Sequence, residues 1–435
     1  MAAPHPSDAI EVDVHKARDS TLHSLMLDCK RLLSSGEANS VTIARDLVTR
    51  FGALPDDQQA AFFERLSRDF GPDPMAVLES AQTYADQPNA HNLMRLTHLA
   101  EPPRQELLRR INRLPGGTSN IVAMRRALLP RVTEQPELQA LEADFLHLLS
   151  SWFNPGFLQL QRVDWASSAQ LLEQIIHHEA VHEIDGWDDL RRRLQPDRRC
   201  FAFFHPQLPS EPLIFVEVAL LPDMPGAIAP LIDKASKPLA PEQFKVAAFY
   251  SISNCEPGLR GVSLGNFLIK RVAEELRREL PQLRTFCTLS PIPGFSRWLR
   301  AGAVCEGLPK ARAERLDDAR EVLLDICGND LDRLNTAAGL HALPPGAMQA
   351  LVRLCTFYLA FHSLAADGDP VARFHLANGA RLERLNPLAD LSAKGVKQSL
   401  GMMVNYLYDL QKVETHHKKF TLGEVAHSRA LASQL

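Results

Sequence analysis

Residues 245–299 read KVAAFYSISNCEPGLRGVSLGNFLIKRVAEELRRELPQLRTFCTLSPIPGFSRWL and contain the most informative succession of local patterns in the chain. The first part of this stretch, 246–252, is a short apolar and β-branched run typical of a buried strand. Proline and glycine at 257 and 258 interrupt the run, and apolar residues then recur at helical spacing over 266–280. Residues 283–289 indicate a second strand. The stretch therefore predicts a strand, a turn, a helix and another strand in succession.

The turn before this helix has the composition of an anion-binding loop. A helix N-terminus offers unpaired backbone N–H groups at the positive end of the helix dipole, which suits a phosphate or pyrophosphate. Its glycines allow a ligand to approach the backbone, and its arginine adds a charge-assisted contact. An ordinary turn with glycines for packing is the alternative. The residues predicted to bind are Arg260, Gly261, Val262, Ser263, Leu264 and Gly265.

This turn resembles the Arg/Gln-x-x-Gly-x-Gly/Ala loop with which the GNAT (N-acetyltransferase) superfamily holds the pyrophosphate of coenzyme A. Ser263 replaces the first glycine of that loop, while Gly265 keeps the second. Further segments resemble the malonyl-CoA decarboxylase family, which is built on a GNAT-type catalytic domain. They are LSPIPGF at 289–295, FHLANGA at 374–380, RLN at 384–386 and MVNYLY at 403–408. The resemblance extends over about residues 152–420.

The resemblance implies a carboxy-lyase of fatty acid metabolism that converts malonyl-CoA to acetyl-CoA and CO2. Loss of CO2 leaves a thioester enolate, which must then be protonated at carbon. This chemistry needs hydrogen-bond donors near the thioester oxygen, a polar hold on the carboxylate and a proton source. It requires no metal and no organic cofactor.

Two residues are predicted to be catalytic. Ser290 follows the strand at 283–289, and prolines 291 and 293 remove competing backbone donors from its turn. His375 has an imidazole able to hold or give a proton near neutral pH. By resemblance, Ser290 is the active-site serine, bound to the carboxylate or to His375, and His375 orients the acid and delivers the proton.

Four further polar residues near the C-terminus form a second rank of candidates. They are Asn378, Asn405, Tyr406 and Tyr408. Residues 397–410 are interpreted as a helix, on which tyrosines two residues apart face different directions. At most one of the two tyrosines is therefore expected in the site, and Tyr408 is preferred as the catalytic one.

Two other functions compete with the decarboxylase. An acyl-CoA-dependent acyltransferase would use the same phosphate loop, with a second groove for an amine acceptor. A zinc hydrolase would use HEAVH at 178–182, a formal HExxH match on a helix predicted at 167–183. Its two histidines would bind zinc with Glu179 as general base, but a third ligand is needed and the metzincin continuation is absent.

The periodicity of the whole chain predicts two domains. Helical spacing recurs from 41 to 151, with proline-containing starts at 55 and 72–74, and indicates an all-α bundle over 1–151 with a structural and oligomerisation role. Strands are predicted at 199–205, 212–221, 246–252 and 283–289. The expected fold is thus an all-α bundle followed by a GNAT-like α/β catalytic domain over 152–435, with a mixed, splayed sheet and a helical insertion at about 308–366.

Composition limits the partners and the compartment. The chain has 435 residues, of which 45% are hydrophobic and 23% charged, and its net charge of −4 favours neither nucleic acid nor an anionic membrane as partner. Its seven cysteines are scattered without a CxxC pair, which is typical of reduced thiols. The N-terminus resembles no secretory or transit signal. We expect a cytoplasmic homo-oligomer, a dimer or tetramer.

Overall fold

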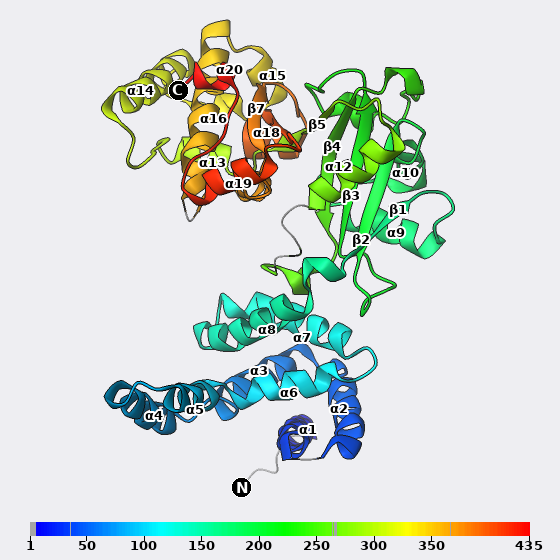
Figure 1. Cartoon of the computed structure of the whole chain (residues 1–435), viewed down its shortest axis with the longest axis vertical. Helices are drawn as coiled ribbons and strands as arrows, with labels where there is room; N and C mark the ends of the chain where they lie inside the picture. Colours follow the sequence, from blue (N-terminus) through cyan, green and yellow to red (C-terminus); the bar gives the residue numbers. More distant parts are fainter. Residues whose placement is uncertain (1–5, 35, 263, 265–267, 366) are drawn as a thin grey trace. The chain divides into compact units, whose positions relative to one another are not determined.

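The structure is a computed structural model that describes residues 6–34, 36–262, 264, 268–365 and 367–435 (Figure 1). Contacts within the chain divide it into two compact units. Unit 1 comprises Met1–Leu158, His205–Ser210 and Glu256–Leu264; unit 2 comprises Gln159–Phe204, Glu211–Cys255 and Gly265–Leu435. Each unit encloses buried apolar residues of its own.

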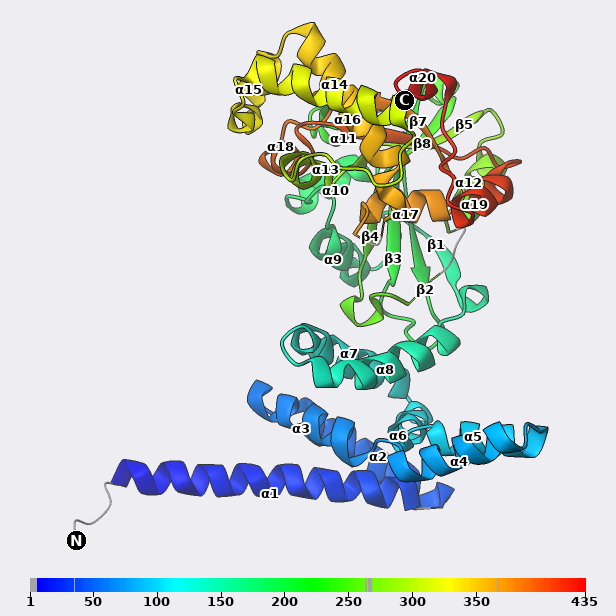
Figure 2. The ribbon, with the colours of Figure 1, turned by 90° about the vertical axis from the view of Figure 1, so that its left-hand side faces the viewer.

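Unit 1 is helical, as its periodicity predicts. Phe51, Phe62 and Phe63 form an aromatic cluster in its core, with ring centroids 5.0, 5.4 and 6.1 Å apart. Helices α4 and α5 lie side by side (Figure 2). The helices are α1 (Pro6–Ser34), α2 (Glu37–Gly52), α3 (Asp56–Asp69), α4 (Pro74–Asp86), α5 (Ala90–Ala100), α6 (Pro103–Asn112), α7 (Gly117–Val132) and α8 (Gln139–Trp152).

Unit 2 is organised on a mixed sheet with the strand order β1-β2-β3-β4-β5-β8-β6, in which β7 pairs with β8. Strands β1 to β4 are antiparallel, β4 and β5 are parallel, and β8 is antiparallel to β5, β6 and β7. The four predicted strands are confirmed as β2 to β5, whereas β1, β6, β7 and β8 were not predicted. The bounds are β1 (Gln159–Val163), β2 (Arg198–Phe204), β3 (Ile214–Leu221), β4 (Val246–Asn254), β5 (Thr285–Thr288), β6 (Ser290–Pro291), β7 (Arg381–Asn386) and β8 (Met403–Leu407).

The sheet opens where β4 leaves β5. The two strands pair from Val246↔Thr285 to Phe249↔Thr288, although β4 continues to Asn254. Leu289 N still donates to Phe249 O at 3.0 Å. One parallel pair joined through a helix, in a sheet that does not close, confirms the GNAT-like fold with a splayed mixed sheet.

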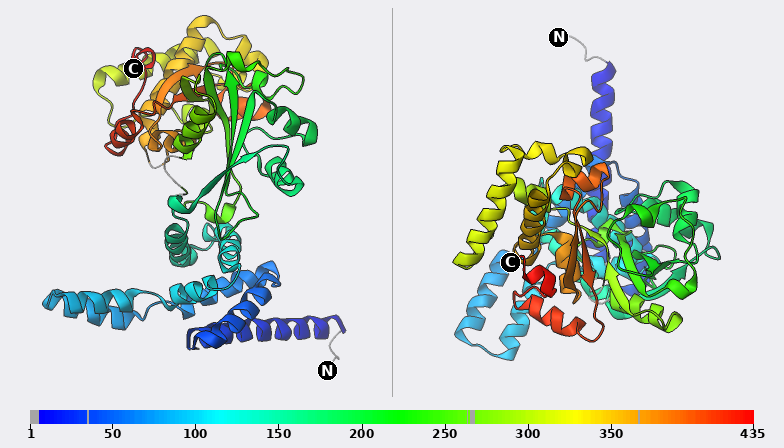
Figure 3. Two further views of the ribbon diagram at one scale, coloured as in Figure 1. Left: turned by 45° about the vertical axis from the view of Figure 1, so that its right-hand side comes forward. Right: turned by 90° about the horizontal axis from the view of Figure 1, so that it is seen from above.

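Helices cover both faces of this sheet (Figure 3). On one face, α9 (Ala169–His178) and α10 (Gly186–Arg193) place Leu172, Ile175 and Leu190 against Ala202 of β2. On the other face lies α12 (Leu268–Glu279), whose Arg271 guanidinium stands 5.5 Å from the Phe203 ring centroid. Neighbouring residues of β2 thus contact different helices, because side chains alternate along a strand.

The remaining helices of unit 2 belong to its second half. Helices α14 and α16 pack together (Figure 2) and lie within the range predicted as a helical insertion. The bounds are α11 (Ala229–Ile232), α13 (Phe295–Arg300), α14 (Lys310–Cys327), α15 (Ala337–His341), α16 (Pro345–Ala360), α17 (Pro370–Ala377), α18 (Ala393–Ser399), α19 (Val413–Thr421) and α20 (Arg429–Ala432). Within the described ranges, no helix has both the length and the apolar character needed to cross a membrane.

The prediction of a helix at 397–410 is wrong. Helix α18 ends at Ser399, and Leu400 and Gly401 both have left-handed backbone conformations, with φ of 52° and 73°. This geometry stops a helix, because the left-handed conformation ends the series of i to i−4 hydrogen bonds. The chain then enters β8, so the tyrosine-rich segment begins as a strand and not as a helix.

Candidate active site

The candidate site begins where β5 ends at Thr288. The short strand β6 pairs with β8 through Ser290↔Val404 and Pro291↔Met403. Leu289 points into the apolar core, and Ser290 is itself buried. The pairing with β8 therefore fixes the backbone that carries the serine hydroxyl.

Helix α17 brings His375 to this serine from 85 residues further along the chain. The His375 side chain is buried, and its Nε2 lies 3.0 Å from Ser290 Oγ. The two residues predicted to be catalytic are thus in direct contact. Their pairing is a geometric result, which sequence spacing alone could not provide.

Both tyrosines near the C-terminus contact the same imidazole. Tyr408 Oη lies 2.9 Å from His375 Nδ1, and the Tyr406 ring stacks on the imidazole with centroids 4.6 Å apart and planes 28° apart. The expectation that at most one tyrosine lies near the site is wrong, because it assumed a helix. In an extended segment, residues two apart lie on the same side.

The hydrogen bonds around Ser290 determine the imidazole tautomer. Ser290 Oγ donates to Thr288 Oγ1 at 2.8 Å, and Tyr406 N donates to the same Thr288 oxygen at 3.2 Å. A serine hydroxyl carries one proton, so Ser290 can only accept from His375. Nε2 of His375 therefore carries the hydrogen, and Nδ1 accepts from the Tyr408 hydroxyl.

Burial keeps this set of groups uncharged. Loss of solvation lowers the pKa of His375 from its usual 6.5 to about 3, because the imidazolium is disfavoured away from water. The same burial raises the pKa values of Tyr406 and Tyr408 well above 10. At neutral pH the site therefore contains a neutral imidazole between neutral hydroxyl groups.

The two asparagines bind backbone carbonyl groups around this set. Asn405 is buried in β8 and donates to Thr288 O at 2.8 Å and to Pro225 O at 3.1 Å. Asn378 follows α17 and donates to Phe374 O at 2.7 Å. Asn405 thus braces the strand end that carries the serine, and Asn378 contacts the last turn of the histidine helix.

The predicted phosphate loop belongs to unit 1 from Arg260 to Leu264, where one buried arginine binds the backbone at the start of the loop. Arg125 of α7 is 1% exposed, and its guanidinium donates to Gly258 O and to Arg260 O, each at 2.7 Å. It also pairs with Glu142 of α8 at 2.5 Å. Sequence reasoning missed this contact, because the unit offered no polar motif.

Part of that loop lies outside the described residues, namely Ser263 and Gly265. Of the described part, Gly261 has φ of 82°, a conformation that glycine adopts without strain. Arg260 is exposed, whereas Val262 and Leu264 are buried.

The HExxH alternative fails on geometry. Helix α9 ends at His178, so the two histidines do not share a helix face. The Glu179 carboxylate accepts from Ser251 Oγ at 2.7 Å and from the backbone N–H of His182 at 2.8 Å. It thus ties this segment to β4. No group of three metal-ligating side chains occurs among the residues with described positions.

Two polar residues of the site escaped prediction. Thr288 shows no sequence signal beyond its place at a strand end. Asp369, in contrast, has a recognisable sequence signal. An aspartate followed by proline is typical of a helix N-cap, and Asp369 caps α17. This signal would have placed the start of the histidine helix.

Comparisons with known proteins agree over most of the chain. Residues 156–435 match the model of the malonyl-CoA decarboxylase C-terminal domain, and residues 70–153 match that of its N-terminal domain. A mitochondrial malonyl-CoA decarboxylase of Mus musculus is 36% identical over 391 residues, which cover 84% of this chain and 80% of the relative.

Solved structures agree as well. The crystal structure of malonyl-CoA decarboxylase from Rhodopseudomonas palustris is similar with a TM-score of 0.83 and 44% identity, covering 95% of this chain and 99% of that one. The Agrobacterium vitis structure is similar with a TM-score of 0.81 and 44% identity, covering 94% and 99%.

Proposed function

Since this chain belongs to the malonyl-CoA decarboxylase family, we propose that it converts malonyl-CoA to acetyl-CoA and CO2. The observation that carries the proposal is the buried row Tyr408–His375–Ser290, joined by contacts of 2.9 and 3.0 Å. It offers an oriented N–H and hydroxyl groups in a water-poor setting, as protonation of an enolate requires.

The reaction divides into two steps with different needs. In the first, the bond between the methylene carbon and the carboxylate breaks, CO2 leaves, and the electron pair stays on the thioester enolate. In the second, the methylene carbon takes a proton. Because malonyl-CoA enters with an ionised carboxylate, each turnover consumes one proton from solvent.

We assign the proton transfer to His375 and the orientation to Ser290. The Nε2–H group of His375 is the acid that faces Ser290, and Ser290 orients it by accepting its hydrogen bond. As Nε2 loses its proton, Nδ1 takes one from the Tyr408 hydroxyl, and Tyr408 takes one from solvent in the same step, so that no buried phenolate is left. The imidazole then returns to the Nε2–H tautomer before the next turnover. The imidazole thus stays neutral, in keeping with its lowered pKa.

We further propose that the loop at 260–265 binds the pyrophosphate of the CoA moiety. The support is the resemblance of its sequence to the GNAT loop and the bracing of Gly258 O and Arg260 O by Arg125. A braced loop loses less conformational entropy when it binds a ligand.

The proposal also covers assembly and location. All seven cysteines are free thiols, which favours a reducing compartment such as the cytoplasm. We propose a homo-oligomer formed through the helical unit. Light scattering of the purified chain gives its mass in solution, and a monomeric mass would contradict this part of the proposal.

A product assay tests the activity. Chelator-treated protein is mixed with malonyl-CoA in 2H2O without an acceptor, and acetyl-CoA and CO2 are measured. We expect equal amounts of both, with solvent deuterium in the acetyl methyl group. No product without an amine acceptor would favour the acyltransferase, and recovery on adding zinc would favour the hydrolase.

A further inference from the structure

Asp369 joins the two segments that carry the serine and the histidine. Its carboxylate is 0% exposed. One oxygen, Oδ1, accepts from the backbone N–H groups of Val371 and Ala372, each at 3.0 Å. The other oxygen, Oδ2, accepts from Gly294 N at 3.0 Å and from Tyr358 Oη at 3.3 Å. Four donors from three segments therefore meet on one side chain.

The first pair of donors sets the position of the histidine helix. Val371 and Ala372 belong to the first turn of α17, and His375 follows on its second turn. An N-cap side chain fixes where a helix begins and satisfies its first N–H groups. Asp369 thereby sets where the imidazole stands along the axis of α17.

The second pair of donors fixes the serine turn. Gly294 closes the segment Ser290–Pro291–Ile292–Pro293–Gly294, and the two prolines have no N–H with which to anchor it. The bond from Gly294 N to Oδ2 therefore ties this turn to the start of α17. A side chain at 294 would break the arrangement, since a Cβ there would stand 2.0 Å from Tyr358 Oη.

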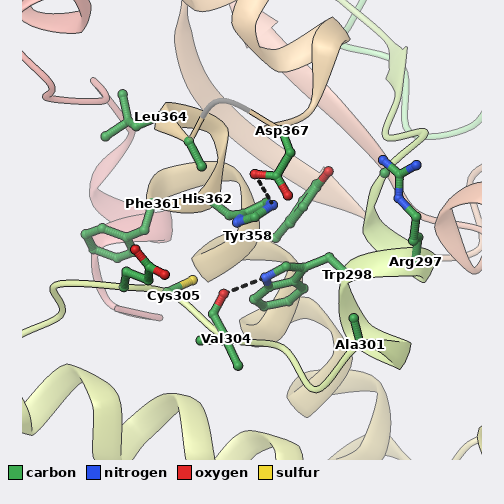
Figure 4. A pocket seen from close by; sticks show the side chains of 13 residues that line it. Arg297, Trp298, Ala301, Val304, Cys305, Tyr358, Phe361, His362, Leu364 and Asp367 are labelled. Carbon is green, nitrogen blue, oxygen red and sulfur yellow. Dashed lines mark hydrogen bonds and ion pairs between the residues drawn. The ribbon is translucent and has the colours of Figure 1, made fainter. Parts of the chain in front are cut away.

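The Tyr358 side chain that binds Asp369 is held in place by ring packing. Its ring stacks on His362, with centroids 5.3 Å apart and planes 28° apart, and lies 5.2 Å from the Trp298 ring. Figure 4 shows these three rings together in the wall of a cavity of about 810 Å³. That cavity is lined by neither Ser290 nor His375, so the tyrosine hydroxyl is positioned by packing outside the catalytic pair.

We propose that Asp369 is a positioning residue of the decarboxylase, which holds Ser290 and His375 in register by binding the turn of one and the helix of the other. It touches neither reacting group. The proposal rests on the proposed function for its effect on turnover, but its geometric content is independent of that function.

The variant Asp369→Asn tests the proposal with little change in shape. An asparagine keeps one acceptor oxygen but replaces the other with an NH2 group, which cannot accept from both segments. We expect kcat to fall by about 10- to 100-fold while KM stays within about twofold. The control is Asp330→Asn, which alters another N-cap aspartate of unit 2 that accepts from Asp332 N at 2.9 Å. The control is expected to keep wild-type kcat.

Two readouts separate positioning from general damage. In a Ser290→Ala background, Asp369→Asn should cost little further kcat, because the contact it maintains is already lost. A full additional loss would overturn the proposal. A crystal structure of Asp369→Asn should show Ser290 Oγ and His375 Nε2 beyond hydrogen-bond distance, and an unchanged 3.0 Å contact would also overturn it.

The crystallographic result decides even if the wild-type chain proves inactive on malonyl-CoA. In that case the proposed function fails, whereas the positioning role is still decided by the distance between Ser290 Oγ and His375 Nε2 in the variant. An active wild type with an unaffected Asp369→Asn variant would instead leave the function intact and reject the role of Asp369.

Discussion

The imidazole of His375 and the guanidinium of Arg125 are both buried basic groups, but the first is neutral and the second is charged. His375 forms no ion pair with any residue that the structure describes, and burial lowers its pKa so that it is neutral at pH 7. Arg125 is paired with Glu142 and bound to two carbonyl groups, so it stays charged. Unit 2 thus surrounds the proposed chemistry with neutral donors, while unit 1 uses a charged side chain to brace the proposed binding loop. Variants of His375 and its neighbours should therefore change kcat, whereas variants of Arg125 should change KM.

Removal of the imidazole should have the largest effect. We expect His375→Ala to lower kcat by about 10²- to 10⁴-fold, the usual contribution of a general acid, with little change in KM. Steady-state kinetics with malonyl-CoA measure both constants. His91→Ala, at an exposed position of α5, is the control. A variant that retains wild-type kcat would remove His375 from the mechanism.

The buried neutral imidazole should make the free energy of unfolding fall at acid pH, which is the next largest effect. The folded pKa of His375 is about 3 and the unfolded value is 6.5, so the unfolded chain binds the extra proton as pH falls below 6.5. Stability from this group is therefore complete above pH 6.5 and declines toward pH 3. Between pH 7 and pH 4 the loss is on the order of 3 kcal/mol.

Urea unfolding of wild type and His375→Gln at both pH values measures this term. The variant cannot titrate at this position, so it should lose less free energy of unfolding between pH 7 and pH 4. Equal losses in the two proteins would show that the imidazole is not buried in its neutral form.

The binding loop should respond in KM. Arg125→Met keeps much of the buried stem but removes the bonds to Gly258 O and Arg260 O, each worth about 1.5–3 kcal/mol when the donor is charged. We expect about 1.4 kcal/mol of this to be lost from CoA binding, so KM should rise by about tenfold with unchanged kcat. Arg104→Met is the matched control, because Arg104 is a buried arginine of unit 1 paired with Asp144 at 2.5 Å. A loss of kcat in Arg125→Met without a change in KM would break the comparison.

The smallest effect should come from the hydroxyl behind the histidine. Tyr408→Phe removes the donor to Nδ1 at 2.9 Å but leaves the imidazole in place. Loss of one such bond of about 1 kcal/mol should lower kcat by about fivefold. Tyr250→Phe is the control, since Tyr250 is also buried and its hydroxyl has no hydrogen-bond partner among the described residues. Equal kcat values in the two variants would exclude Tyr408 from the relay.

Sequence patterns predicted the helical unit and the four strands β2 to β5, because long amphipathic runs and apolar strands carry local signals. They failed at β8, where MVNYLY suits either a helix or a strand. Gly401 marked the stop of the preceding helix. The contact of Ser290 with His375 had no local signal, since it depends on how 85 residues fold between them. Resemblance to a family supplied both residues, and Thr288 had no signal from either source.

The pH dependence of kcat for malonyl-CoA decarboxylation shows whether a neutral imidazole is the acid. With His375 neutral down to pH values near 3, kcat should stay level between about pH 5 and pH 7.5. A change in kcat centred near pH 6.5, absent from the residual activity of His375→Gln, would show that His375 titrates with its ordinary pKa and would contradict the account.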